Sequence, residues 1–486
     1  MTTVSEIFEA VLKEIIPTNR ELKLINIIVE KLKSLLEEKA KELKIDYTRI
    51  EPQGSTGIKQ TQLRDDFDID LFVGLNFILY KSKYEGLSKN KFKKESKKDF
   101  LKFCNEWIIK SLTPEDFHNP RLLYAEHPYV TVDYISEDIK LKVDIVLYFD
   151  LDLEFIKKNG PKTAVDRSPW HGRFVRDELS MDQKNDVRLL KQFFKACHCY
   201  GDKSTVGKIG FFGYSAELLI YYFGTIQKLF ENFDTIAKNP LDYYKRNKRE
   251  LEEIVHFQND YLIITDPIDK NRNVASAISE KAYKYCNQQI KDFISNPSIE
   301  FFQVQSIPEA DLSDSGHHLL SKIYILEFKS TNDSVHYTIH RDKLYSLGDS
   351  IKANGEKEYS HAERFKNIIF EVYFEDKINE YNLAIFCEEP NISTSYIRRG
   401  PPIEDKSHAD KFKVKNSDYF EKDGYLWCET KRKFTEFLNY LNYFIKNKKI
   451  DNLKLINLSR SSKVRTSSGK KTIYILEKMI LPLYLL

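Results

Sequence analysis

The first forty-odd residues carry apolar side chains at the spacing of amphipathic helices. Apolar residues recur every three or four positions over residues 4–16, and Pro17 ends that run. Thr18 and Glu21 then have the spacing of a capping box, in which each side chain satisfies a backbone N–H of the other residue. The pattern therefore predicts two helices, the second of which continues to about residue 43.

Strand-like segments follow, and they are rich in β-branched and aromatic residues. They cover residues 67–75, 121–125, 129–135 and 139–149, with the clearest alternation near the end of the last segment. A mixed sheet flanked by helices is the simplest arrangement of these segments. Between them, the lysine-rich stretch 81–98 also contains acids, and we expect a mobile loop there.

The spacing of the apolar residues changes again near residue 182, where long runs with helical spacing begin. Beyond about residue 255, strand-like segments return at 261–265, 324–330, 368–375 and 382–389, with helical stretches between them. These alternations predict an α+β multidomain chain with a mixed-sheet N-terminal domain and a helical middle domain. The expected domains are residues 1–155, 156–255, 256–365 and 366–486.

Total charge does not favour a nucleic-acid partner, because 76 Lys and Arg nearly balance 73 Asp and Glu in the 486 residues. The distribution is more informative. Residues 441–471 hold nine basic side chains, including Lys446, Lys448 and Lys449, against Asp451 alone. This segment is a candidate RNA-binding surface, although a solvated helix face followed by a basic loop would have the same composition.

Structural zinc sites and membrane proteins are disfavoured by the residues present. The six cysteines are scattered without the CxxC pairs of a structural zinc site. The N-terminus lacks the basic and apolar regions of a signal peptide, and no segment has the 18 or so uninterrupted apolar residues of a membrane-spanning helix. We therefore expect a globular cytoplasmic protein without a membrane partner.

The sharpest local motif is GSTGIKQTQLRDDFDID at residues 54–70, in which a Gly54-Ser55 turn precedes Asp68 and Asp70. Side chains two residues apart in a strand point to the same face, so the two carboxylates project together. Adjacent ionised acids repel each other unless a cation lies between them. Oxygen ligands at this spacing suit Mg²⁺.

Asp144 is the expected third acid, because it lies in the most regular strand-like segment, where an isolated charge is costly to bury. Three carboxylates that hold two divalent ions can activate a 3′-hydroxyl and stabilise a departing pyrophosphate. The Gly54-Ser55 turn offers backbone N–H groups and a hydroxyl to a triphosphate. A surface strand can carry an Asp-x-Asp pair without any such role, and we expect Asp150 and Asp152 to be a solvated pair of that kind.

Together these motifs resemble the polymerase-β-like nucleotidyltransferase superfamily, which includes poly(A) polymerases and CCA-adding enzymes. Further segments are similar, in order and spacing, to the archaeal-type (class I) CCA-adding tRNA nucleotidyltransferases, and the resemblance covers most of residues 50–410. These segments are YAEHPYV at 124–130, DRSPWHGRFV at 166–175, NDVRLLKQFFKACHCYG at 185–201, GFFGYSAELLI at 210–220, DPIDKNRNVASA at 266–277 and RRGPP at 398–402.

The resemblance implies template-independent addition and repair of the 3′-terminal CCA of tRNA from CTP and ATP. The reaction would be a two-metal-ion nucleotidyl transfer with Mg²⁺ as cofactor. The implied parts are a nucleotidyltransferase head at 1–155, a nucleotide-binding helical neck at 156–255, an α+β body at 256–365, and a tail with a returning C-terminal segment at 366–486 that binds tRNA. Whether the enzyme is a homodimer is left open.

The resemblance also assigns roles to single residues. Catalysis and metal binding would fall to Asp68, Asp70 and Asp144. The nucleotide would be bound by Gly54, Ser55, Lys59, His171, Lys191, Tyr200 and Arg272. RNA would be bound by Arg398, Arg399, Lys446, Lys448 and Lys449.

The sequence departs from the family's usual pattern in the glycine-serine loop. This loop is one residue longer, with Ile58 and Lys59 in the region where an arginine is expected and Gln62 near the position of a tryptophan. Another RNA-tailing or oligonucleotide-forming enzyme, similar to a poly(A) polymerase, therefore remains an alternative. A non-catalytic RNA-binding relative is a further alternative, which the presence of all three acids disfavours.

Overall fold

The computed structural model describes residues 3–66, 68–124, 127–136, 139–313, 318–358 and 362–485. The chain forms two compact units. The first consists of Met1–Cys197, Phe211–Ile278 and Asn287–Gln303, and the second consists of His198–Gly210, Ser279–Cys286 and Val304–Leu486. The expected head and most of the expected neck fall in the first unit. The division into four domains stays a prediction.

The two N-terminal helices of the first unit are those that the sequence predicts. They are α1 (Val4–Ile15) and α2 (Asn19–Leu43). The capping box is present: Glu21 donates its backbone N–H to the Thr18 hydroxyl at 3.2 Å, and its carboxylate accepts the Thr18 backbone N–H at 2.5 Å. Both predicted helices are therefore confirmed.

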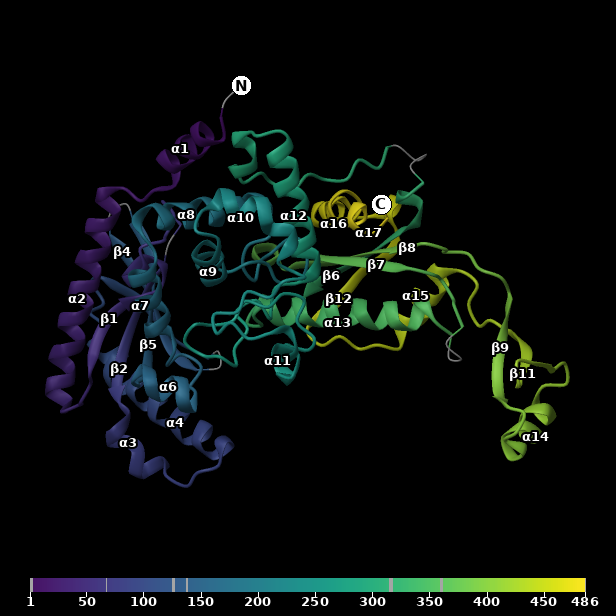
Figure 1. Cartoon of the computed structure of the whole chain (residues 1–486), viewed down its shortest axis with the longest axis horizontal. Coiled ribbons are helices and arrows are strands. Elements are labelled where there is room, and N and C mark those ends of the chain that lie inside the picture. Colours follow the sequence, from purple (N-terminus) through teal and green to yellow (C-terminus); the bar gives the residue numbers. More distant parts are fainter. Residues whose placement is uncertain are drawn as a thin grey trace. The chain divides into compact units, whose positions relative to one another are not determined.

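A five-stranded sheet follows, with strand order β1-β2-β5-β4-β3 (Figure 1). Its strands are β1 (Arg49–Gln53), β2 (Ile69–Asn76), β3 (Phe117–Tyr124), β4 (Pro128–Ser136) and β5 (Ile139–Asp150). β2 and β5 are parallel, whereas the other neighbouring strands are antiparallel. The predicted mixed sheet is confirmed.

The two faces of this sheet carry different side chains, because successive residues of a strand point to opposite sides. Ile69 and Leu71 of β2 are buried and belong to the same apolar cluster as Leu36 of α2. Asp70 and Phe72 alternate with them and therefore point to the opposite face. One face is thus packed against helices, and the other is left for a functional site.

The lysine-rich stretch does not form the mobile loop that the sequence predicted. It forms the end of α3 (Phe77–Tyr84) and most of α4 (Lys89–Phe103), which Ser88 caps. The prediction was wrong because charge dominates the composition, while a few rings, including Phe92 and Phe100, fix the helices to the apolar cluster. A helix can be held in this way by a narrow apolar stripe.

The helical run predicted from residue 182 is confirmed. The short helix α5 (Ile109–Ser111) precedes β3. The helices that follow the sheet are α6 (Leu153–Asn159), α7 (Ser168–Glu178), α8 (Met181–Ala196), α9 (Gly213–Phe223), α10 (Ile226–Asn232), α11 (Lys248–Glu252) and α12 (Glu280–Ser295). The strand predicted at 261–265 was wrong: only isolated bridges form there, at Ile264 and Thr265. Leu262 and Ile264 are buried there without pairing in a ladder.

The second unit contains two antiparallel sheets (Figure 1). The larger has the order β12-β6-β8-β7, and its members are β6 (Ile323–Ser330), β7 (Ile368–Glu375), β8 (Glu380–Cys387) and β12 (Leu453–Arg460). The smaller consists of β9 (Ser395–Pro402), β10 (Phe420–Lys422) and β11 (Tyr425–Lys431). The helices are α13 (Tyr337–Glu356), α14 (Lys406–Lys415), α15 (Phe437–Lys446), α16 (Ser467–Tyr474) and α17 (Pro482–Leu485).

The three strands predicted between residues 324 and 389 are therefore confirmed as β6, β7 and β8. All six cysteines of the chain are buried. Among the described helices, none combines the length and the apolar character that a membrane crossing requires.

Candidate active site

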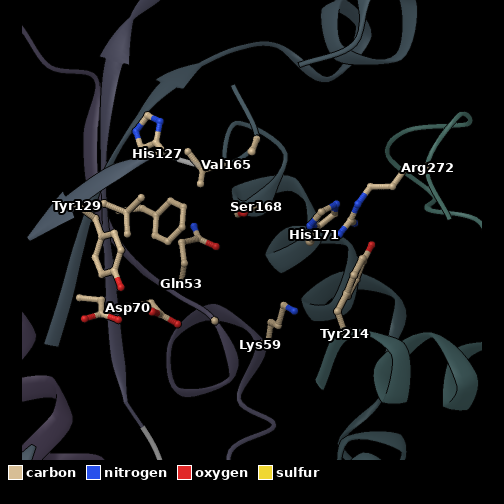
Figure 2. A pocket seen from close by; sticks show the side chains of 15 residues that line it. Gln53, Lys59, Asp70, His127, Tyr129, Val165, Ser168, His171, Tyr214 and Arg272 are labelled. Atoms are coloured by element: carbon tan, nitrogen blue, oxygen red, sulfur yellow. The ribbon is translucent and has the colours of Figure 1, made fainter. Parts of the chain in front are cut away.

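A cavity of about 530 Å³ opens on the face of the sheet that carries Asp70. Its walls come from β2, β4, β5, the glycine turn, α7, α9 and the loop that contains Arg272. Figure 2 shows the carboxylate of Asp70 on one side of the cavity and the side chains of Lys59, His171 and Arg272 toward the other. The cavity is therefore acidic at one end and basic at the other.

The structure brings the predicted acids together at the sheet. Asp70 and Asp144 are direct partners in the parallel pair β2–β5, whose strands lie about 4.8 Å apart, and both line the cavity. Asp68 immediately precedes β2, and its side chain is exposed. Burial raises the pKa of Asp70 to about 6, and the charges of Asp144 and Asp68 add to the shift. Although residue 68 is exposed to solvent, partial desolvation of its carboxyl by the surrounding protein raises the pKa of Asp68, which Lys142 opposes and Asp144 reinforces.

The carboxylate of Asp144 fits a divalent cation as a ligand. Its Oδ2 accepts a hydrogen bond from Lys142 Nζ at 2.7 Å, whereas its Oδ1 is buried and has no donor among the described residues. A buried polar atom without a partner is costly, and a cation would satisfy it. Within the described parts of the chain, no three His, Cys, Asp or Glu side chains already surround a metal position. As the structure has it, Asp68 does not complete such a group with Asp70 and Asp144.

Gly54 brings the backbone of the turn against the carboxylate of Asp70. Its φ of +68° lies in the region that favours glycine, and a Cβ at this position would collide with Asp70 Oδ2. The chain then makes one wide turn over Ser55–Lys59, and Thr61 closes it by donating its N–H to the Ser55 carbonyl at 2.9 Å. The turn thus places Lys59 in the cavity wall.

A buried acid that the sequence analysis missed holds two of the predicted cations. Glu217 of α9 is 1% exposed and accepts hydrogen bonds from Lys59 Nζ and Thr61 Oγ1, each at 2.6 Å. Its Oε1 lies 3.5 Å from Lys191 Nζ, which also donates to the Thr61 carbonyl at 2.9 Å. Lys191 therefore lies behind the glycine turn and does not line the cavity.

The ionisation of this cluster follows from its burial. Burial alone would raise the pKa of Glu217, but Lys59 and Lys191 hold that pKa below its ordinary value. Burial lowers the pKa of Lys191 to about 8, which Glu217 opposes. The sequence does contain a signal for Glu217, since it is a single acid in the apolar run SAELLI, where an unpaired charge would be costly.

A second buried acid, Asp266, positions the basic end of the cavity. It is 0% exposed and accepts hydrogen bonds from His171 Nε2 and an Arg272 guanidinium N–H, each at 2.8 Å, and from the Tyr214 hydroxyl at 3.2 Å. All three donors line the cavity. Burial alone would raise the pKa of Asp266, but His171 and Arg272 hold it well below its ordinary value. Burial also lowers the pKa of His171.

Gln53 is a further residue of the cavity wall that the sequence did not indicate. The residue is 1% exposed, and neither its Oε1 nor its Nε2 has a hydrogen-bond partner among the described residues. A buried amide that lacks partners loses about 1–3 kcal/mol per group. A bound molecule that hydrogen-bonds the amide would remove this cost.

Asp150 is not solvated as the sequence predicted. Its carboxylate accepts a hydrogen bond from Arg49 Nε at 2.8 Å, and its side chain is only 10% exposed. Asp152, in contrast, is exposed. Neither residue lines the cavity.

The remaining predicted residues belong to the second unit. α8 ends at Ala196, so Tyr200 lies beyond it, and its expected role in nucleotide binding stays a prediction. Arg398 donates to Asn416 Oδ1 at 3.1 Å, and the Arg399 guanidinium lies 3.5 Å from the ring centre of Tyr425. Lys446 ends α15, and the exposed residues Lys448 and Lys449 follow it.

The chain is similar in sequence to known proteins. Residues 185–303 match the family described as tRNA nucleotidyltransferase, second domain. The chain is 31% identical over 429 residues to the CCA-adding enzyme of Saccharolobus islandicus, and the match covers 87% of this chain and 88% of that enzyme. The chain belongs to the CCA-adding enzyme family.

Another member of the CCA-adding enzyme family, from Methanocaldococcus jannaschii, is 28% identical over 478 residues, which cover 96% of this chain and 95% of that enzyme. A solved structure of Cid1, studied for its RNA terminal uridylyl transferase activity, has a TM-score of 0.45 at 14% identity and covers 63% of this chain and 98% of its own. Nucleotidyltransferases of this type use divalent metal ions, which suits the carboxylates at the acidic end of the cavity.

Proposed function

We propose that this chain adds the 3′-terminal CCA to tRNA from CTP and ATP without a nucleic-acid template. The observation that carries the proposal is the polarised cavity: Asp70 and Asp144 lie side by side at one end, and Lys59, His171 and Arg272 lie toward the other. A nucleoside triphosphate with its metal ions has the complementary distribution of charge. We also place the enzyme in the cytoplasm, where these dissolved substrates would be met.

We propose Mg²⁺ as the ion, with Asp68, Asp70 and Asp144 as its ligands. When bound, it would supply Lewis-acid stabilisation of the triphosphate and of the departing pyrophosphate. Asp144 is the residue we assign to accept the proton of the attacking 3′-hydroxyl. The new bond joins that oxygen to the α-phosphorus of the incoming CTP or ATP, and the bond between this phosphorus and the departing pyrophosphate breaks.

The other lining residues bind the nucleotide in this proposal. The backbone N–H groups of the Gly54 turn and the hydroxyl of Ser55 contact phosphate oxygens, and Lys59 and His171 supply hydrogen bonds or charge to them. Arg272 contacts the base, and the amide of Gln53 supplies a donor and an acceptor to the same ligand. Lys191 lies behind the glycine turn and holds it in place by donating a hydrogen bond to the Thr61 carbonyl.

The test is incorporation of labelled CMP and AMP into tRNA that lacks its CCA end. Asp144→Asn should abolish incorporation and leave tRNA binding unchanged, because only the metal and proton functions are removed. Asp152→Asn changes an exposed acid outside the cavity and should leave incorporation unchanged. Full activity of Asp144→Asn would contradict the assignment of the carboxylates.

The same assay separates the proposal from a poly(A)-type activity. A CCA-adding enzyme requires both CTP and ATP and stops after three nucleotides, whereas a poly(A) polymerase extends the RNA with ATP alone. Continued extension with ATP alone would contradict the proposed function and would leave the site assignment intact.

A further inference from the structure

Two more cavities of the first unit adjoin the candidate active site along α4. The nearer, of about 350 Å³, shares His127 and Ala164 with the active-site cavity, and the farther, of about 610 Å³, shares Lys89 and Lys162 with the nearer one. Figure 2 shows His127 on the side of the active-site cavity away from Arg272. The two cavities therefore continue the active site in one direction, and we call them together the basic groove.

The basic groove is lined by cations on both sides. Lys89, Lys93 and Lys97 come from α4, and Lys162 comes from the segment between α6 and α7. Arg167, from the same segment, also lines the groove but already pairs with Asp269 at 2.7 Å. No acid is among the described residues that line the nearer cavity, and Glu85 is the one acid among those that line the farther. This concentration of positive charge, in a chain of net charge +3, indicates an anionic ligand.

The spacing of the three lysines of α4 places them on one face of the helix. Residues four apart on a helix are neighbours, and three lysines at this spacing extend over about 12 Å of the axis. Like charges at this spacing destabilise a helix slightly. Neither Lys89 nor Lys93 has an acid within ion-pair distance among the described residues, so no such pair offsets the repulsion between these two lysines.

Other lysines of α3 and α4 are neutralised by the protein itself. Lys83 pairs with Asp99 at 2.5 Å, and Lys98 pairs with Glu95 at 2.7 Å. Lys102 lies 3.8 Å from Glu106. Some lysines of this region are thus paired by acids of α4 or of the turn after it, whereas others line the groove.

Aromatic rings accompany the cations of the groove. Phe92 is half-buried and lines both cavities. Lys162 Nζ lies 5.2 Å from the ring centre of Phe155 and 5.6 Å from that of Phe77, and both rings line the farther cavity. A path that combines cations with partly exposed rings is typical of sites for single-stranded nucleic acid, where phosphates meet lysines and bases stack on rings.

We propose that the basic groove binds the single-stranded 3′ end of the RNA substrate and leads it to the carboxylates of the active site. This inference rests on the proposed function, because it deepens the binding of the same substrate. The nucleoside triphosphate is the weaker candidate, since its phosphates have Lys59 and the Gly54 turn in the adjoining cavity. An RNA duplex is also weaker, because its paired bases cannot reach the rings.

A charge-matched pair of variants tests the proposal. The groove variant combines Lys89→Gln, Lys93→Gln and Lys97→Gln, and the control combines Lys91→Gln, Lys94→Gln and Lys98→Gln. Both remove three positive charges from exposed positions of α4, and Gln preserves helix propensity. Steady-state kinetics with tRNA ending in CC and with tRNA lacking all of CCA then reports the KM for RNA, and ATP and CTP titrations report the KM for nucleotide.

The groove variant should raise the KM for tRNA ending in CC about tenfold, with a smaller effect on tRNA that lacks CCA and so has a shorter single strand. The slope of log Kd against log salt should fall by about 0.7 for each phosphate that the variant no longer neutralises. The control variant should change neither quantity. The KM values for ATP and CTP should remain those of the unmodified enzyme in both variants.

Equal effects of the two variants on RNA would overturn the proposal, because they would show only the loss of net charge. A higher nucleotide KM with unchanged RNA binding would assign the groove to the triphosphate instead. Direct RNA binding is measured separately from incorporation. An unmodified enzyme that binds tRNA but adds no C or A would refute the proposed function, whereas normal CCA addition by the groove variant would refute only the groove.

Discussion

Two buried acids, Glu217 and Asp266, bind side chains that line the candidate active-site cavity. Glu217 accepts hydrogen bonds from side chains of the glycine loop. Asp266 accepts them from side chains of α7 and α9 and from Arg272 in its own loop. A buried carboxylate is stable only when several donors compensate its lost hydration. The need for donors therefore fixes the positions of Lys59, His171 and Arg272.

Replacement of Glu217 by Gln should destabilise the fold. The amide keeps the shape of the side chain but leaves the ammonium groups of Lys59 and Lys191 without their buried counter-charge. Breaking a buried pair in this way costs about 3–5 kcal/mol. Urea unfolding measures the loss, with Glu231→Gln at an exposed position of α10 as the control. Equal midpoints for the two variants would contradict the role of Glu217.

The carboxyl of Asp166 should make stability depend on pH. It is 1% exposed and accepts the N–H groups of Phe149, Lys162 and Thr163, yet burial raises its pKa to about 6. The folded state therefore binds a proton between about pH 4 and 6 that the unfolded state has released. This contribution to stability is fully present below pH 4 and is lost as pH rises to 6.

Asp166→Asn removes that titration. The free energy of unfolding of the unmodified protein, relative to the variant, should fall by a few kcal/mol from pH 4 to pH 6 and then remain constant. Urea titrations at several pH values measure the difference. A difference that stays flat over this range and changes only below pH 4 would show that hydrogen bonds, rather than burial, dominate the pKa of Asp166.

At the scale of elements, the turn between β1 and β2 forms part of the cavity wall beside the sheet. Gly54 has positive φ and supports the carboxylate of Asp70, while the wide turn after it carries Lys59 into the wall. The turn is therefore fixed at its first end by the contact of Gly54 with Asp70 and at its other end by Lys59 in the cavity wall. Because a Cβ would not fit beside Asp70, this geometry depends on glycine at position 54.

Gly54→Ala should greatly reduce nucleotide incorporation while the protein stays folded. Alanine at this φ costs about 1–2 kcal/mol, and its methyl group also displaces the carboxylate of Asp70. Gly224→Ala is the matched control, because Gly224, at the end of α9, also has a positive φ of +81° with open space around it and lines neither the active-site cavity nor the basic groove. Equal losses of activity in the two variants would show that backbone strain alone is responsible.

The sequence predicted those parts of the molecule that depend on local spacing. Alternation in β2 identified Asp70, and the capping box identified the start of α2. Glu217 and Asp266 were missed because their partners lie far away in the sequence: 158 residues separate Glu217 from Lys59, and 95 separate Asp266 from His171. The position of Lys191 behind the turn likewise depends on packing between α8, α9 and the glycine loop.

At the scale of the whole molecule, some of the basic side chains of segment 441–471 are already paired with acids, whereas others are not. In the second unit, Lys470 pairs with Glu309 at 3.0 Å, Lys471 with Glu375 at 2.6 Å, and Lys449 lies 3.7 Å from Asp451. Lys446 and Lys448 have no acid within ion-pair distance among the residues that the structure describes. The charge available to RNA therefore includes the end of α15, together with the exposed residues Lys454, Arg460, Lys463 and Arg465 further along the segment.

Neutralising Lys446, Lys448 and Lys449 together should raise the KM for tRNA more than it lowers kcat. The substitutions remove phosphate contacts without touching the first unit, so the salt dependence of tRNA binding should also become weaker. The combination Lys470→Gln and Lys471→Gln, whose charges acids already neutralise, is the control. Unchanged tRNA kinetics in the triple variant would remove this segment from the interface.

The burial of all six cysteines makes thiol chemistry a probe of local opening. Burial raises the pKa of Cys104 to about 12, so a reagent that needs a thiolate cannot react until the surrounding helices separate. Cys104 and Cys197 belong to the first unit, and Cys387 and Cys428 belong to the second. Labelling rates resolved by mass spectrometry would therefore give each unit its own opening equilibrium, and a bound nucleotide should slow the first pair alone.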